Sequence, residues 1–139
     1  MRSGTLAFLA LLALAAPSLA GDDDKKGAVH KVTQSKSYLM IDPIYATIVR
    51  DERPAGLLMI GIGIDVPDET LRGEADHAMP VLRDAYVRNL MAFAATQVRT
   101  NRQPDVALIA SRLQAVTDRA LGRKGAKVLL AQVAMRLTH

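Results

Sequence analysis

Apolar and polar residues alternate most regularly between Leu57 and Val66. One side of this segment carries Ile60, Ile62, Ile64 and Val66, and the other carries Gly61, Gly63 and Asp65. A period of two is typical of a half-buried strand. The two glycines leave the second face bare, which invites the close approach of another backbone or a helix.

Two further segments have strand character. Tyr38–Val49 is rich in β-branched and aromatic residues, and Asp42-Pro43 in its middle predicts an edge strand or a strand broken at that point. Asp51–Gly56 has the composition of a turn. Ala126–Leu137 returns to alternation near the C-terminus. It sets Val128, Leu130, Gln132, Ala134 and Arg136 on one face, opposite Leu129, Ala131, Val133, Met135 and Leu137.

A helical period begins after the central strand. Pro67–Thr70 suits a helix start, Gly73 weakens this first stretch, and Pro80 restarts or kinks the helix before Val81–Val98. The apolar stripe comprises Leu82, Tyr86, Leu90, Phe93 and Ala94, and a second apolar side comprises Val87, Met91 and Val98. A helix that is apolar on two sides is either deeply packed or shared with a partner.

A second long helix follows the polar break at Thr100–Gln103. Pro104 and Asp105 open it, and Gly122 is a natural glycine for its C-terminal end. Its expected buried stripe is Val106, Ile109, Leu113, Val116 and Ala120. The resulting order is β-β-α-α-β, which predicts an α+β domain with a small three-stranded sheet and two long helices packed on it.

The N-terminal segment has the pattern of a secretory signal peptide. Arg2 precedes the apolar run Leu6–Ala16, and the small residues Ser18 and Ala20 suit cleavage before Gly21. A short membrane anchor is the alternative, although Pro17 interrupts the run well before the length that a bilayer core requires. We therefore expect a signal peptide or short anchor over 1–20, a flexible polar tether over 21–37 and one domain over 38–139.

Composition narrows the class of protein further. The 139-residue chain has a formal net charge of +4, few aromatic residues and no cysteine. Its mild basicity suits an anionic membrane surface, but it lacks the basic patch and stacking residues of a nucleic-acid binder. Without cysteine, an exported domain depends on its core for stability and has neither a thiol nucleophile nor a cysteine metal ligand.

Searches for reactive motifs favour structural interpretations throughout. The histidines are His30, His77 and His139, and none has metal-ligand spacing with another. Asp76 with His77 is better read as a solvated helix face than as an acid–base pair. The acidic residues Asp65, Asp68 and Glu69 fit a helix start better than a calcium site. We therefore expect no catalytic residue, cofactor or metal, and we expect Asp84 and Arg88 to form an exposed helical ion pair.

Several local strings resemble the periplasmic domain of the FliL family, proteins associated with the flagellar basal body. Tyr38–Val49, with its Asp-Pro pair, is similar to that family's opening strand, and Leu57–Val66 to its second. Met79–Ala85 contains a Pro-x-x-Arg-Asp string like that of the family's long helix. Arg112–Leu121 followed by Lys127–Leu130 is similar to its last helix and closing strand.

The resemblance implies a stomatin-like fold and a non-enzymatic role in the periplasm, in association with the inner membrane. Its implied partners are flagellar stator or basal-body proteins and further copies of the chain, with no nucleic acid and no small-molecule substrate. The expected partner interface comprises Pro80, Arg83, Asp84, Val87 and Met91. Two alternatives stay open: an exported envelope binding or assembly module unrelated to motility, and an exported enzyme using Asp76 and His77.

Overall fold

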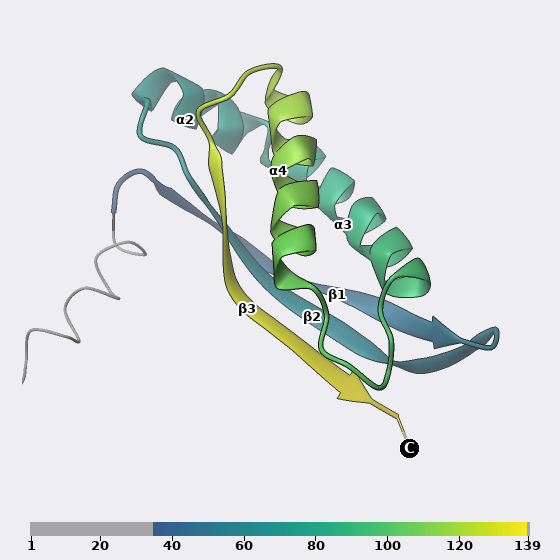
Figure 1. The fold of residues 1–139 in the computed structure, drawn as a ribbon. Helices are drawn as coiled ribbons and strands as arrows, with labels where there is room; N and C mark the ends of the chain where they lie inside the picture. Colours follow the sequence, from purple (N-terminus) through teal and green to yellow (C-terminus); the bar gives the residue numbers. More distant parts are fainter. Residues whose placement is uncertain (1–34, 139) are drawn as a thin grey trace, which may run out of the picture.

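The computed structural model describes residues 35–138, which form one antiparallel sheet and three helices. The sheet order is β1-β2-β3. In chain order the elements are β1 (Tyr38–Arg50), β2 (Arg53–Asp65), α2 (Glu69–His77), α3 (Met79–Thr96), α4 (Val106–Leu121) and β3 (Lys127–Leu137). Helices α3 and α4 lie along the same face of the sheet, and α2 lies at the end where β2 finishes (Figure 1). The predicted α+β class is confirmed, with a short separate α2 added before the two long helices.

A tight turn joins β1 to β2. Asp51 and Glu52 have φ angles of 50° and 61°, which is the left-handed conformation at both central positions that two-residue hairpins use. The predicted turn over Asp51–Gly56 was too long. Pro54 does not stop β2 because it lies close to the hairpin, where it pairs with Val49.

Both outer strands bulge at the same level of the sheet. Asp42 and Pro43 interrupt the register of β1 between Ile41 and Ile44, which confirms the expected edge strand with an irregularity at proline. On β3, Ala131 is the extra residue between the pairs that Leu130 and Gln132 make with β2. The two bulges flank Gly61.

The bulge at Ala131 corrects the predicted faces of β3. Strict alternation placed Val128 with Gln132 and Arg136, but an inserted residue exchanges the faces beyond it. The residues of β3 that pack toward the core are Val128, Leu130, Val133, Met135 and Leu137.

The core lies between the sheet and the helices. Ile60, Ile62 and Ile64 of β2 are buried there, as predicted. The buried residues of α3 are Leu82, Tyr86, Leu90, Phe93 and Ala94, so the predicted stripe is confirmed in full. Of the second apolar side, Val98 is buried, Val87 packs partly against the core and Met91 is exposed.

The predicted stripe of α4 was partly wrong. Ile109 and Leu113 are buried, but the next turn buries Thr117, while Val106 and Ala120 are exposed. Thr117 is tolerated in the core because its hydroxyl donates to the backbone carbonyl of Leu113, 2.7 Å away. Val116 packs partly against the core.

The helix boundaries follow the expected capping chemistry. The carboxylates of Asp68 and Asp105 accept hydrogen bonds from Leu71 N and Leu108 N at the starts of α2 and α4. Gly122, with φ 68°, ends α4. Pro80 opens α3 as expected, but the helix ends at Thr96, two residues earlier than predicted.

Across residues 35–138, no helix combines the length and apolar character needed to cross a membrane. The signal peptide or anchor predicted over 1–20 lies outside the described residues, as does most of the tether predicted over 21–37. His30 and His139 lie outside them too.

Candidate interaction surface

The five residues expected to meet a partner lie on one side of α3. Spacings of three and four residues from Pro80 to Met91 place them along one stripe of the helix. Pro80 and Asp84 are exposed, and Met91 is 52% exposed. Val87 is half-buried because it also packs against the core. This stripe therefore offers both apolar and charged groups to solvent.

Arg83 has a structural contact that sequence reasoning did not predict. Its guanidinium donates to the backbone carbonyl of Asp42, with 3.1 Å between Nη1 and oxygen, and lies 3.7 Å from the Asp42 carboxylate. Asp42 belongs to the bulge of β1. Arg83 thus ties the first turns of α3 to the free edge of the sheet, and it occupies a carbonyl that would otherwise be open to an added strand.

Asp84 and Arg88 form the predicted ion pair one helical turn apart. Both side chains are more than half exposed, so the pair adds little to stability because water screens the two charges. The negative charge of Asp84 and the positive charge of Arg88 neutralise each other on this surface. Met91, one turn beyond Val87, is then the exposed large apolar side chain of the stripe.

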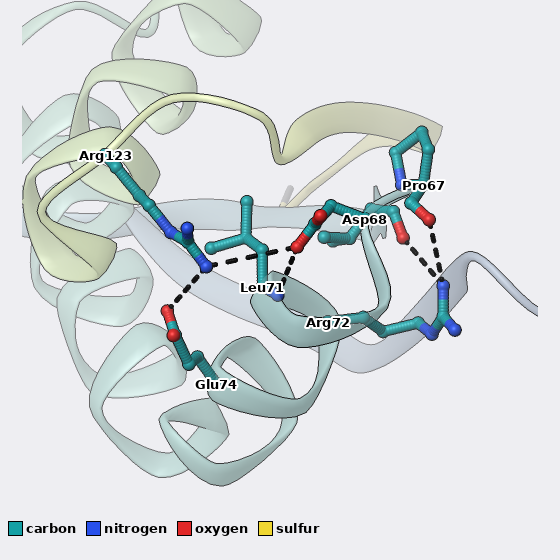
Figure 2. Close-up of polar contacts among 7 residues, drawn as sticks. Pro67, Asp68, Leu71, Arg72, Glu74 and Arg123 are labelled. Carbon is teal, nitrogen blue, oxygen red and sulfur yellow. Dashed lines mark hydrogen bonds and ion pairs between the residues drawn. The ribbon is translucent and has the colours of Figure 1, made fainter.

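The acidic cluster after β2 acts as a polar clamp on α2. Asp68 caps α2 and lies 4.0 Å from the Arg123 guanidinium, which also donates to Glu74 at 3.1 Å (Figure 2). Arg72 donates to the backbone carbonyls of Val66 and Pro67 from the other side of the turn (Figure 2). The clamp joins the end of β2, the start of α2 and the segment after α4. Asp68 therefore serves as a cap, as expected from its position.

His77, which with Asp76 was considered as an acid–base pair, is exposed to solvent. Asp76 and His77 are both exposed at the end of α2, and Glu74 is engaged by Arg123. Within residues 35–138, no three histidine or acidic side chains gather closely enough to hold a metal ion. The residues of this end of α2 are thus arranged as a solvated helix face.

Tyr86 has an altered pKa, and its role is structural. Burial raises the pKa of Tyr86, the hydrogen bond with Thr117 lowers it, and the nearby charge of Asp118 raises it further. The two hydroxyl oxygens are 2.5 Å apart in the interface of α3 with α4. Tyr86 is fully buried, so this pair holds two helices together and is closed to any ligand.

The structure reveals a second surface that sequence reasoning missed. Among residues 35–138, no helix covers the opposite face of the sheet (Figure 1). Alternation from the buried isoleucines places the other residues of each strand on this outer face. The apolar ones are Met40, Tyr45, Val49, Leu57, Met59, Leu129, Ala131 and Ala134, and Thr47, Gln132 and Arg136 lie on the same face.

The outer face also explains the glycines of β2. Within the described part of the chain, the expected helix or further backbone does not approach them there. Instead the ring of Tyr38 lies over Gly63, where an added Cβ would fall 2.0 Å from the tyrosine oxygen. At Gly61 an added Cβ would make only ordinary contact, at 3.4 Å from Gln132. The signal that sequence reasoning lacked was the pair of bulges, which set the faces of the outer strands.

Comparison of the chain with protein-family models, with curated proteins and with solved structures finds no match. The function of the described surfaces is therefore inferred from their geometry and composition. An exposed, mainly apolar sheet face and a mixed stripe on α3 that includes the exposed Met91 suit binding to other proteins.

Proposed function

We propose that this protein is an exported, non-enzymatic interaction protein that supports the flagellar motor in the periplasm. The observation that carries the proposal is the exposure of large apolar side chains on α3 and on the outer sheet face. A monomeric soluble protein rarely leaves such patches open unless they contact another protein or a membrane. The resemblance of Met79–Ala85 and Tyr38–Val49 to FliL-family strings directs the proposal to stator or basal-body partners.

The contact between these two strings supports the proposal at the level of the fold. Arg83 of the Pro-x-x-Arg-Asp string reaches Asp42 of the Asp-Pro bulge. Because Arg83 and Asp42 contact each other, the same interaction accounts for the arginine in one string and the aspartate in the other. The remaining residues of the α3 stripe, above all Met91, are free to meet the partner.

The test compares two glutamate variants in the host. Met91→Glu places a charge in the proposed interface, while Val106→Glu places the same charge on α4, where Val106 is similarly exposed. We expect a deletion strain to swim poorly, Val106→Glu to restore swimming and Met91→Glu to fail. A tagged protein should recover stator or basal-body proteins from membranes, and Met91→Glu should reduce that recovery at unchanged protein level.

The outcomes separate the alternatives. Normal swimming of the deletion strain, together with recovery of envelope proteins unrelated to motility, would replace the flagellar role with a general envelope assembly role. An exported enzyme would instead lose its activity in a His77→Ala variant. We expect that variant to restore swimming fully.

A further inference from the structure

We infer that the outer face of the sheet binds the same face of a second copy of this chain, with β2 over β2 and β1 over β3. The inference deepens the proposed function, on which it rests for its biological purpose. It names the surface through which copies associate, and leaves α3 for other partners.

The composition of the outer face is that of an interface centre. Met40 is 79% exposed and Tyr45 55% exposed, and Leu57 and Met59 lie on the neighbouring strand. Tyrosine, methionine and arginine are enriched in protein interfaces, whereas lysine and acidic residues are depleted. The charged residues of this face stand toward its ends: Asp65 and Lys127 at one end and Arg136 near the other.

The area of the face suits association with another sheet. Three strands about 4.8 Å apart and roughly ten residues long span about 14 Å by 33 Å. Two such faces packed as in a β-sandwich would remove roughly 1,000 Å² of surface from water, which is near the lower limit for specific association. We therefore expect a dimer that dissociates on dilution.

The distribution of side-chain size across the face favours a second copy as the occupant. At the level of Met59, the register runs from Tyr45 to Ala134, so a large residue on β1 stands at the height of a small one on β3. At the level of Gly63 it runs from Met40 to Leu129, so two large residues flank a glycine. A two-fold axis along β2 places each Tyr45 over the partner copy's small β3 residue. The same axis places Met59 of one copy over Met59 of the other.

The same axis places the two copies of Asp65 over each other at one end of the face, with Lys127 of each copy on the neighbouring strand, and it suits Arg136 and the terminal residues. The register runs from Thr47 through Leu57 to Arg136, so each arginine meets a hydroxyl of the other copy instead of a like charge. The two copies of Tyr38 then stand at one end of the dimer. Both chains would enter the domain from the same side, as two chains tethered to one membrane would require.

The experiment measures the mass of the purified protein by sedimentation velocity over a wide range of concentration. We expect the unaltered chain to pass from monomer to dimer as its concentration rises through the micromolar range. Tyr45→Lys and Ala134→Arg should each raise the midpoint at least tenfold, because they face one another across the proposed interface. Val81→Lys on α3 is the control, since Val81 is 61% exposed, and it should leave the midpoint unchanged.

A second measurement fixes the orientation. The chain has no cysteine, so Met59→Cys adds one thiol on β2 and Val81→Cys one thiol on α3. A short bismaleimide should link two Met59→Cys chains efficiently and two Val81→Cys chains poorly. Circular dichroism of each variant checks that it is folded.

Several results would overturn the inference. The first is a chain that stays monomeric at every concentration. The second is an equal shift of the midpoint by Tyr45→Lys and Val81→Lys. The third is a Tyr45→Lys protein that dimerises normally yet loses a different partner. A chain that is monomeric with residues 1–20 but dimeric without them would assign the face to its own leader. If the purified protein dimerises as expected but the deletion strain swims normally, the flagellar role alone is contradicted.

Discussion

At the scale of single residues, the hydroxyl pair between Tyr86 and Thr117 joins two helices inside an otherwise aliphatic core. Thr117 donates to Leu113 and so receives the Tyr86 hydroxyl on its oxygen. A buried hydroxyl without a partner would cost about twice what the bond itself contributes. The pair therefore specifies how α3 and α4 meet.

Tyr86→Phe should lower the free energy of unfolding by about 0.5–1.5 kcal/mol at neutral pH, because it removes one hydrogen bond while Thr117 keeps its bond to Leu113. Urea unfolding of the two proteins checks the value. Tyr45→Phe is the matched control at a protein concentration where the chain is monomeric, since the Tyr45 side chain is then exposed. Equal losses in both variants would contradict a specific role for the buried pair.

The same substitution should change the dependence of stability on alkaline pH. The pKa of Tyr86 is raised above 10.0 in the folded protein, so above about pH 10 the unfolded chain releases this proton before the folded chain does. The free energy of unfolding should therefore fall as pH rises from 10 toward the folded pKa. Tyr86→Phe should show a smaller fall over the same range, measured by thermal unfolding at a series of pH values.

At the scale of the elements, two glycines of β2 differ in what surrounds them. An added Cβ at Gly56 would lie 2.5 Å from the backbone oxygen of Arg136, which cannot move without disturbing β3. At Gly61 the nearest atom would be 3.4 Å away, beside the two bulges. Because Gly56 has no side chain, β2 and β3 can approach each other closely at this position.

Gly56→Ala should lower the free energy of unfolding by about 1–3 kcal/mol through this clash, whereas Gly61→Ala should change it by less than about 1 kcal/mol in either direction. Thermal or urea unfolding of both variants tests the difference. A greater loss at Gly61 than at Gly56 would show that the bulged centre of the sheet, and not its end, is the tightly packed place.

Sequence patterns predicted the elements better than their faces. The stripe of α3 was obtained in full because five apolar residues repeat at helical spacing without interruption. Thr117 was missed since a pattern of apolar residues does not include a threonine whose hydroxyl bonds to the preceding turn. The inner side of β3 was misassigned beyond Ala131, because a bulge depends on pairing with β2 and leaves no mark in the period.

At the scale of the whole molecule, one core connects the sheet to all three helices. Its buried residues come from each element, from Ile41 in β1 to Val128 in β3. The candidate stripe on α3 was predictable from helical spacing, but the outer face of the sheet was not. That face depends on which side the helices cover, and a sheet with apolar residues on both sides leaves the choice to tertiary packing.

A single core implies that the described domain unfolds in one cooperative step. The chain has no tryptophan, so in a Tyr38→Phe/Tyr45→Phe background Tyr86 alone reports on the core by fluorescence, and far-ultraviolet circular dichroism reports on the helices and strands. The two signals should give the same midpoint in urea at a fixed protein concentration. Leu90→Ala, which removes a buried side chain from the centre of α3, should lower the free energy of unfolding by about 2–5 kcal/mol and move both signals together.

The region that would break this cooperativity first is α2. It is short, and only Leu71 and Ala75 of its residues are buried, so the clamp formed by Arg123 with Asp68 and Glu74 is the main additional link to the rest of the domain. Because these ion pairs are half exposed, Arg123→Ala should cost no more than about 1 kcal/mol and leave the two midpoints equal. An early loss of helical signal in this variant, ahead of the tyrosine signal, would mean that α2 is held by the clamp and not by the core.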